Sequence, residues 1–234
     1  MKKTIGVLGG MGPLATADLM AKIAKLTKAS CDAEHIRVYV DSNPAIPDRT
    51  AAILENGPDP VEEMTSALRH LEACGADCII MPCNTAHWFL PRLQCLTKTP
   101  FLDMTKIAAQ CCAERFPGNR IAVLATTGTL ATGLYEKALA AQNVPCLLPD
   151  EKEQAVLMHL IYDVVKASRP LLPEADTWRT LLAGMRKRGA DAFLLACTEL
   201  PVLAEELREP GPFIDTTEEL ARAAIRFCGY ECLE

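Results

Sequence analysis

Residues 189–201 read GADAFLLACTELP, and residues 75–87 read GADCIIMPCNTAH. Each stretch begins with Gly-Ala-Asp, continues through a short apolar run and places a cysteine six residues after the aspartate, at Cys83 and at Cys197. A short apolar run bounded by turn residues is typical of a buried strand. The two copies therefore predict one structural unit that occurs twice, with a cysteine at the carboxyl end of the same strand in each.

The repeat extends over most of the chain. The run NRIAVLATTGT corresponds to KTIGVLGGMG, and GPFIDTTEEL corresponds to TPFLDMTKI. The matched positions lie 116, 114 and 112 residues apart in the pairs Ile5 and Ile121, Cys83 and Cys197, and Asp103 and Asp215. Three matches in the same order at a nearly constant offset indicate an internal duplication.

Candidate strands and helices alternate through both copies. In the first copy the strands are KTIGVLGG, HIRVYVDS, DCIIMPCN and TPFLDM, and the helices are 14–29 and 60–74. The second helix has the apolar spacing of an amphipathic helix, with one face formed by Val61, Met64, Leu68 and Leu71. Alternation of this kind predicts an α/β fold with parallel sheets.

We therefore expect two pseudo-symmetric α/β lobes, each a mainly parallel sheet flanked by helices. The first lobe is predicted to comprise residues 1–102 and 212–234, and the second residues 103–211. Ligands of open α/β sheets bind outside the carboxyl ends of the strands, where both cysteines are expected. The active site is accordingly predicted in the cleft between the lobes.

Composition excludes several classes of protein. The chain has 234 residues, half of them hydrophobic, and a formal net charge of -6 without a basic run, which argues against a nucleic-acid partner. No apolar stretch approaches the roughly 20 residues that span a bilayer, and the N-terminus MKKTIGVLGG lacks the features of a signal peptide. We expect a soluble, cytoplasmic protein. Its eleven cysteines, an odd number without regular spacing, are interpreted mainly as buried thiols.

Paired thiols suggest proton transfer. Asn84, Thr85 and Thr198 follow the two cysteines where helices are expected to begin, and such residues together with free backbone N–H groups can hold a carboxylate. A thiolate on one side could remove a proton from a stereocentre while a thiol delivers one to the opposite face. This chemistry needs neither a metal nor pyridoxal. The plain alternative is that each cysteine only packs at the end of its strand.

Other polar positions near the expected strand ends are candidate substrate contacts. The turn GGMGP contains Met11 and three glycines that would admit a ligand to backbone N–H groups, and its counterpart ATTGT contains Thr126 and Thr129. Arg49 lies in the loop after the second strand. Lys166 is near a predicted helix end, where a solvated lysine is the ordinary interpretation.

Two further kinds of site have weaker support. GGMGP is not the GxGxxG pattern of dinucleotide-binding proteins. Cys78, Cys83 and His87 could be imagined around a metal, but no fourth ligand has normal zinc spacing, so no metal is expected.

The motifs GGMGP, MPCNTAH and ACTELP, in this order along the whole chain, resemble the cofactor-independent aspartate/glutamate racemase superfamily. The resemblance is greatest to its aspartate racemases. It implies two pseudo-symmetric lobes, no cofactor, a homodimer, a small amino-acid substrate, and Cys83 and Cys197 as the opposed acid and base.

The resemblance also bears on the substrate. Glutamate racemases usually have Asp-Ser after the first strand and Cys-Thr-His at the second cysteine, whereas this chain has Gly10-Met11 and Cys197-Thr198-Glu199. Glu199 thereby joins the candidate substrate contacts. Arg49 and Lys166 match the arginine and lysine with which aspartate racemases hold the side-chain carboxylate.

Several alternatives stay open from the sequence. These are a racemase of glutamate or of many amino acids, a relative that decarboxylates malonates, isomerises maleate or racemises hydantoins, and a non-catalytic dicarboxylate-binding protein. A thiol redox protein has little support because the chain contains no CxxC motif.

Overall fold

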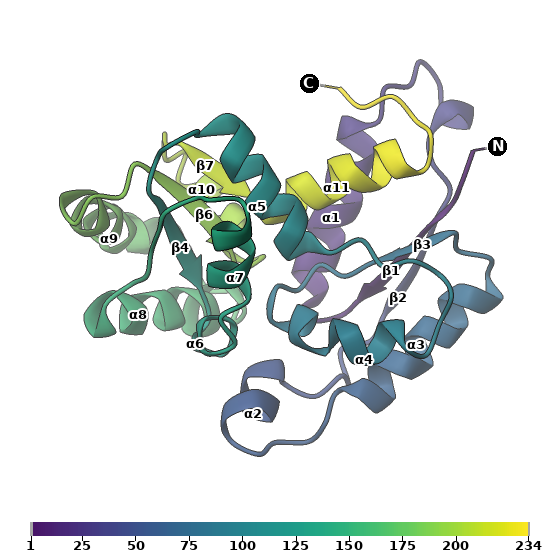
Figure 1. Ribbon diagram of the computed structural model, residues 1–234, viewed down its shortest axis with the longest axis horizontal. Coiled ribbons are helices and arrows are strands. Elements are labelled where there is room, and N and C mark those ends of the chain that lie inside the picture. The colour runs from purple at the N-terminus through teal and green to yellow at the C-terminus, as the bar shows by residue number, and fades with distance from the viewer. Residues whose placement is uncertain (1, 234) are drawn as a thin grey trace. The chain divides into compact units, whose positions relative to one another are not determined.

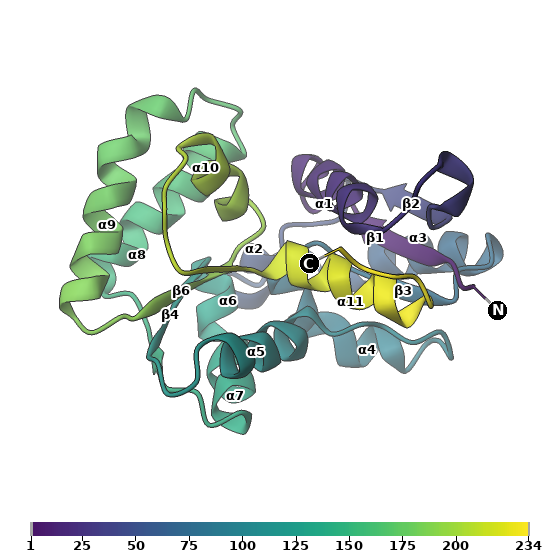
Figure 2. The ribbon, with the colours of Figure 1, turned by 90° about the horizontal axis from the view of Figure 1, so that it is seen from above.

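The computed structural model describes residues 2–233, which form two compact units. The first unit contains the chain up to Ile107 and again from Thr217, and the second is Ala108–Thr216. Each unit has one parallel sheet with helices on both of its faces (Figure 1; Figure 2). The predicted α/β architecture of two lobes, each built on a parallel sheet flanked by helices, is confirmed.

The first unit contains a three-stranded sheet in the order β2-β1-β3. Its strands are β1 (Ile5–Gly9), β2 (Val38–Ser42) and β3 (Cys78–Ile80). Its helices are α1 (Pro13–Leu26), α2 (Arg49–Leu54), α3 (Val61–Ala73) and α4 (Leu90–Gln94), with short 3-10 segments at Asp32–Glu34 and Thr85–Phe89.

The second unit contains a four-stranded sheet in the order β5-β4-β6-β7. Its strands are β4 (Ile121–Ala125), β5 (Cys146–Leu147), β6 (Ala192–Ala196) and β7 (Phe213–Asp215). Its helices are α6 (Thr127–Ala131), α7 (Leu134–Ala141), α8 (Glu151–Met158), α9 (Ala175–Lys187) and α10 (Leu200–Glu206), with a π-helical segment His159–Val165 and a 3-10 segment Leu172–Glu174. Two helices, α5 (Met104–Arg115) and α11 (Thr216–Phe227), run across the boundary between the units.

The two sheets have equivalent topology, as the sequence repeat predicts. Ile5 of β1 pairs with β2 on one side and with β3 on the other. Its counterpart Ile121 of β4 pairs with β5 and with β6. The first strand of each copy is therefore paired on both sides, and the strand before each cysteine lies beside it.

Side chains of the central strands alternate between two buried cores in each unit. Every residue of β1, β4 and β6 is buried, which is expected of parallel strands covered on both faces. In the second unit, Phe193 and Leu195 pack in a core with α8, α9 and α10, whereas Leu194 packs in a core with α5 and α7. Figure 2 shows these two sets of helices on opposite sides of β4 and β6.

Two details differ from the sequence prediction. TPFLDM was expected to form a fourth strand of the first sheet, but it contributes only an isolated parallel bridge from Phe101 to Ile79. Residues 212–216, expected in the first lobe, belong to the second unit because β7 pairs with β6. Residues 103–107, expected in the second lobe, belong to the first unit.

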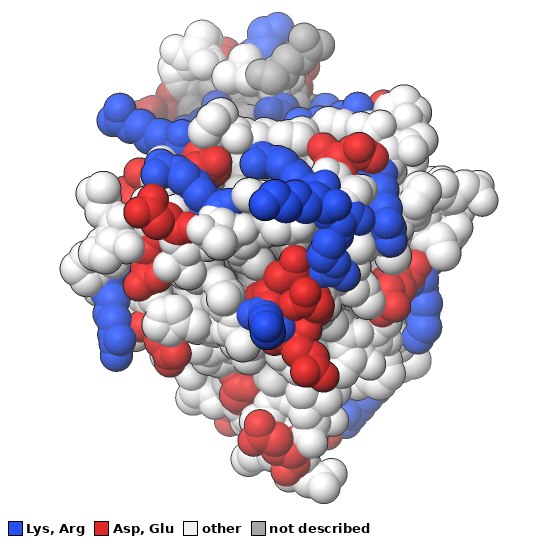
Figure 3. All heavy atoms as spheres, turned by 90° about the vertical axis from the view of Figure 1, so that its left-hand side faces the viewer, with Lys and Arg blue, Asp and Glu red and all other residues white. Residues whose placement is uncertain are grey.

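Charged residues of both signs lie on the surface. On the face drawn in Figure 3, Lys and Arg side chains are interspersed with Asp, Glu and uncharged residues. Within residues 2–233, no helix combines the length and the apolar composition that crossing a bilayer requires.

Candidate functional site

Cys83 lies where the chain leaves the first sheet. Its side chain is only 6% exposed and packs with Ile79 and Met81, so the cysteine continues the every-second-residue alternation of β3. Its backbone N–H donates to the Met81 carbonyl at 2.8 Å, which turns the chain toward the 3-10 segment that begins at Thr85. The predicted position at the carboxyl end of a buried strand is thus confirmed.

Asn84 and Glu199 directly precede the helical segments that follow the two cysteines. Neither side chain makes a capping hydrogen bond to its segment. Both Asn84 and Thr85 are buried, as is Thr198 in the second unit.

His87 holds the backbone around Cys83. Its Nδ1 lies 2.9 Å from the Cys83 carbonyl, and the Met104 backbone N–H donates to its Nε2 at 3.1 Å. Since Nε2 accepts, the proton is on Nδ1 and the ring is the neutral tautomer. Burial lowers the pKa of His87, against an opposing effect of Asp103.

The conceivable metal site at Cys78, Cys83 and His87 is not formed. Both ring nitrogens of His87 are engaged by backbone groups, and the Cys78 sulfur lies 3.9 Å from the sulfur of Cys228. Among the residues that the structure describes, no group of three or more His, Cys, Asp or Glu side chains is arranged to hold a metal ion.

The glycine turn after β1 allows a close approach between two backbone segments. Gly10 has a φ of +89°, and a Cβ there would lie 2.3 Å from the Asn43 backbone, so only glycine fits. Its N–H donates to the Thr16 hydroxyl at 2.9 Å. The interpretation of Gly10 as an N–H group open to a ligand is therefore wrong.

Arg49 is a buried cation next to that turn. It is 7% exposed, and its guanidinium donates to three backbone carbonyls, those of Met11 at 3.1 Å, Pro47 at 3.0 Å and Ile46 at 3.2 Å. The structure thereby joins two predicted site residues, Arg49 and Met11, in one network. The carbonyls fix the direction of the guanidinium.

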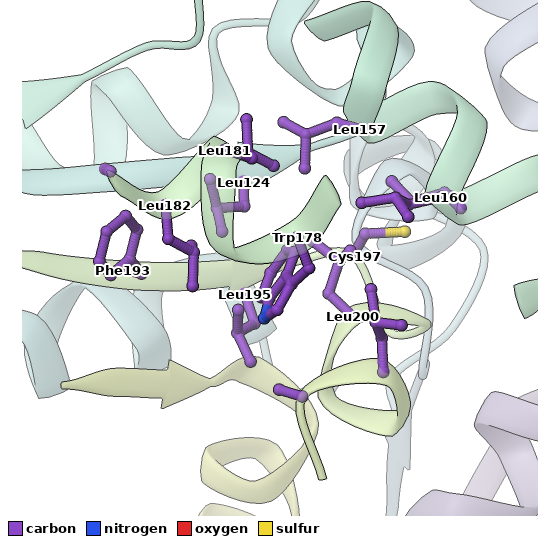
Figure 4. Close-up of a cluster of buried hydrophobic side chains, with 14 of the residues drawn as sticks. Leu124, Leu157, Leu160, Trp178, Leu181, Leu182, Phe193, Leu195, Cys197 and Leu200 are labelled. Carbon is purple, nitrogen blue, oxygen red and sulfur yellow. The ribbon is translucent and has the colours of Figure 1, made fainter. Parts of the chain in front are cut away.

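Cys197 has the equivalent place in the second unit. It is 6% exposed and continues the alternation of Phe193 and Leu195 at the end of β6. Figure 4 shows its sulfur at the margin of the apolar cluster, directed away from Trp178. Thus both cysteines occupy the same position relative to their own sheets.

A buried carboxylate adjoins Cys197. Glu199 is 5% exposed, and its Oε2 accepts hydrogen bonds from the Cys197 thiol at 3.0 Å and from the Thr198 hydroxyl at 3.3 Å. Burial raises the pKa of the Cys197 thiol well above its usual range, and the Glu199 charge raises it further, whereas Lys166 lowers it. Three predicted site residues are therefore brought together with Lys166 as a charged neighbour.

Lys166 follows the π-helical segment rather than an ordinary helix end. Its backbone N–H donates to the Ile161 carbonyl, five residues earlier, and its Nζ lies 4.4 Å from the centre of the Tyr162 ring. Lys166 is partly buried. The sequence does not predict the contact of Tyr162 with Lys166, because no motif marks a π-helical turn.

The threonines after β4 cap a helix. Thr126 accepts from the Thr129 backbone N–H at 3.2 Å, and the two hydroxyls are 3.0 Å apart. Gln154, which the sequence did not single out, donates from Nε2 to the Ala125 carbonyl and the Thr127 hydroxyl, each at 3.1 Å. The turn equivalent to GGMGP is thus held by side chains from α6 and α8.

Comparison with known proteins agrees with this geometry. The Asp/Glu/Hydantoin racemase family matches residues 8–224. The chain belongs to this family. Among its relatives is the broad specificity amino-acid racemase RacX of Bacillus subtilis, which is 28% identical over 231 residues, or 94% of this chain and 96% of that protein.

Solved racemase structures have the same fold. The Picrophilus torridus aspartate racemase is similar with a TM-score of 0.88 and 34% identity, over 99% of this chain and 96% of that one. Glutamate racemase isoform RacE1 from Bacillus anthracis is similar with a TM-score of 0.65 and 21% identity, over 97% of this chain and 83% of that one. The family and fold inferred from GGMGP, MPCNTAH and ACTELP are confirmed.

Proposed function

We propose that the protein interconverts L- and D-aspartate, with Cys83 and Cys197 as its two proton carriers. The observation that carries the proposal is the equivalent placement of two buried thiols, each continuing the side-chain alternation of a strand in its own sheet. A thiolate removes the Cα proton and the other thiol delivers a proton to the opposite face of the carbanion. One C–H bond breaks and one forms, so no redox equivalent or cofactor is consumed.

The remaining predicted residues would hold the substrate. Arg49 and Lys166 supply the positive charge that the side-chain carboxylate requires, since charge-assisted hydrogen bonds to carboxylates are strong. The proposed further contacts are Met11, Asn84, Thr85, Thr126, Thr129, Thr198 and Glu199. The likeness to the Picrophilus torridus aspartate racemase supports aspartate as the substrate.

Isotope exchange tests this proposal. The purified protein is incubated with L-aspartate in deuterated water, and the product is analysed by NMR and chiral chromatography. We expect D-aspartate with deuterium at Cα. The absence of Cα exchange with both aspartate and glutamate would contradict the proposal, and tight aspartate binding without exchange would indicate a dicarboxylate-binding protein instead.

A racemase of broad specificity is the second candidate. The likeness to RacX along nearly the whole chain favours it. The same exchange assay with a panel of acidic, basic and apolar amino acids separates the two candidates. Exchange confined to aspartate supports the first, and comparable rates across the panel, or a preference for glutamate, support a different specificity.

We further propose that the enzyme is a cytoplasmic homodimer. Light scattering of the purified protein across a concentration series tests the oligomeric state. A mass of one chain, 25.4 kDa, at all concentrations would contradict the dimer.

A further inference from the structure

The two proposed proton carriers differ in the charge beside them. Cys197 is followed by Thr198 and the buried carboxylate of Glu199, which accepts the thiol hydrogen at 3.0 Å. Cys83 is followed by Asn84 and Thr85, which carry no charge. Two residues after the cysteine, the duplication therefore has a buried carboxylate in the second unit, at Glu199, and an uncharged threonine in the first, at Thr85.

An anion in hydrogen-bond contact with a thiol favours the protonated sulfur. A thiolate at Cys197 would lose the hydrogen that it shares with Glu199 and would set two negative charges side by side in a buried place. Lys166, at the end of the π-helical segment, acts in the opposite direction on the same sulfur. Glu199 is in direct contact with the sulfur, whereas Lys166 acts through its charge.

We propose that Glu199, in addition to burial, favours the protonated form of Cys197 in the free enzyme, so that Cys197 is the resting proton donor. Glu199 is thus a positioning residue that sets which half of the site carries the proton. This inference rests on the proposed two-cysteine racemase for its catalytic meaning. The protonation of Cys197 itself can be measured without any substrate.

Binding of a dicarboxylate would strengthen the bias. If Lys166 pairs with the side-chain carboxylate of aspartate, its effect on Cys197 is neutralised while that of Glu199 remains. The substrate would then help to retain the proton on the donor until the carbanion forms.

NMR of protein labelled with 13C at cysteine Cβ tests the inference, because the Cβ shift changes when a thiol ionises. A Cys197→Ser variant identifies the Cys197 resonance, which is then followed against pH in the wild type and in E199Q. E199D retains the charge and serves as the conservative rescue. Glu205→Gln, an exposed position on α10, is the matched charge control.

In the wild type and in E205Q, we expect the Cys197 resonance to leave its thiol position only at a pH well above the ordinary range of a thiol. In E199Q it should move to the thiolate position at lower pH, and E199D should restore most of the wild-type behaviour. The thiolate fraction at fixed pH rises about tenfold for each unit by which the pKa falls. If E199Q folds poorly, Glu199→Met is an alternative variant of similar volume that also removes the charge.

The inference would be overturned if the 13Cβ shift of Cys197 had the same pH dependence in the wild type and in E199Q or E199M. Ionisation of Cys197 near pH 7 in the wild type would overturn it as well. Because the titration uses no substrate, a failure of aspartate racemisation would leave this result intact, and the two proposals fail separately.

Discussion

At the residue scale, both cysteines should be required for turnover. Replacing Cys83 or Cys197 by serine should lower the rate of aspartate racemisation by about 10²–10⁴-fold, the usual size of a general acid or base contribution. Steady-state assays of enantiomer conversion measure this loss, with circular dichroism to verify the fold. Cys74→Ser, at an exposed cysteine, is the control and should keep its activity. Full activity of either site variant would refute the two-thiol mechanism.

His87 should contribute to stability through two backbone groups. In His87→Leu the Cys83 carbonyl and the Met104 N–H lose their partner in a buried place, at a cost of about 1–3 kcal/mol each. Urea unfolding measures the change in the free energy of unfolding. An unchanged midpoint would show that these groups find other partners.

The pH dependence of this effect has a definite sign. Burial lowers the pKa of folded His87 below the usual 6.5, so below about pH 6.5 the unfolded chain binds a proton that the folded protein does not. The wild type should therefore lose stability as the pH falls from 7 to 5. His87→Leu should lack that part of the loss, which parallel urea titrations at pH 5, 6 and 7 can detect.

At the element scale, the π-helical segment directs Lys166. The Tyr162 ring faces the Lys166 ammonium, a contact worth about 0.5–1 kcal/mol at an exposed site. Tyr162→Leu should raise the KM for aspartate about two- to fivefold with little change in kcat, by conversion of that energy. Tyr162→Phe retains the ring face and should resemble the wild type. A matching rise of KM in the phenylalanine variant would assign the effect to the hydroxyl instead.

The elements differ in how far the sequence predicts them. The amphipathic pattern of 60–74 predicts α3 well, because Met64, Leu68 and Leu71 all face the core. The fourth strand of the first sheet was expected at TPFLDM, yet only Phe101 bridges to the sheet. Gln154 contacts Ala125 and Thr127, which are distant in sequence, so local periodicity does not predict these contacts. No motif marks the π-helical turn.

At the scale of the whole molecule, each unit has hydrophobic cores of its own. A substitution that destabilises one core should therefore lower the local stability of that unit most. Trp178 is fully buried in the second unit and stacks on Phe213 with ring centres 6.2 Å apart. Trp178→Ala should destabilise the protein by about 3–5 kcal/mol. Hydrogen exchange should show the larger loss of protection in β4 and β6 than in β1.

Leu68→Ala is the matched experiment for the first unit, with an expected cost of about 2–5 kcal/mol. It should give the opposite pattern, with the larger loss of protection in β1. Equal loss throughout both units in both variants would show instead that the protein opens only as a whole.

The duplication predicted equivalent positions for the two cysteines. Equal spacing from Gly-Ala-Asp to the cysteine in both halves indicated that Cys83 and Cys197 follow equivalent strands, and they follow β3 and β6. The spacing could not show that Glu199 contacts the thiol, since that depends on a side-chain rotamer. Nor could it show where the chain changes units, because the strand pairing of β7 decides that.

The continuity of the second unit and the discontinuity of the first have a consequence for synthesis on the ribosome. Residues 108–216 are consecutive, so the second unit has its complete sequence as soon as they emerge. The core that α1 forms on one face of the first sheet, made earlier, stays incomplete until Leu220, Ala224 and Ile225 of α11 arrive. The part of the chain that is translated first is therefore the last to be completed, and premature termination before α11 would leave part of this apolar core exposed and prone to aggregate.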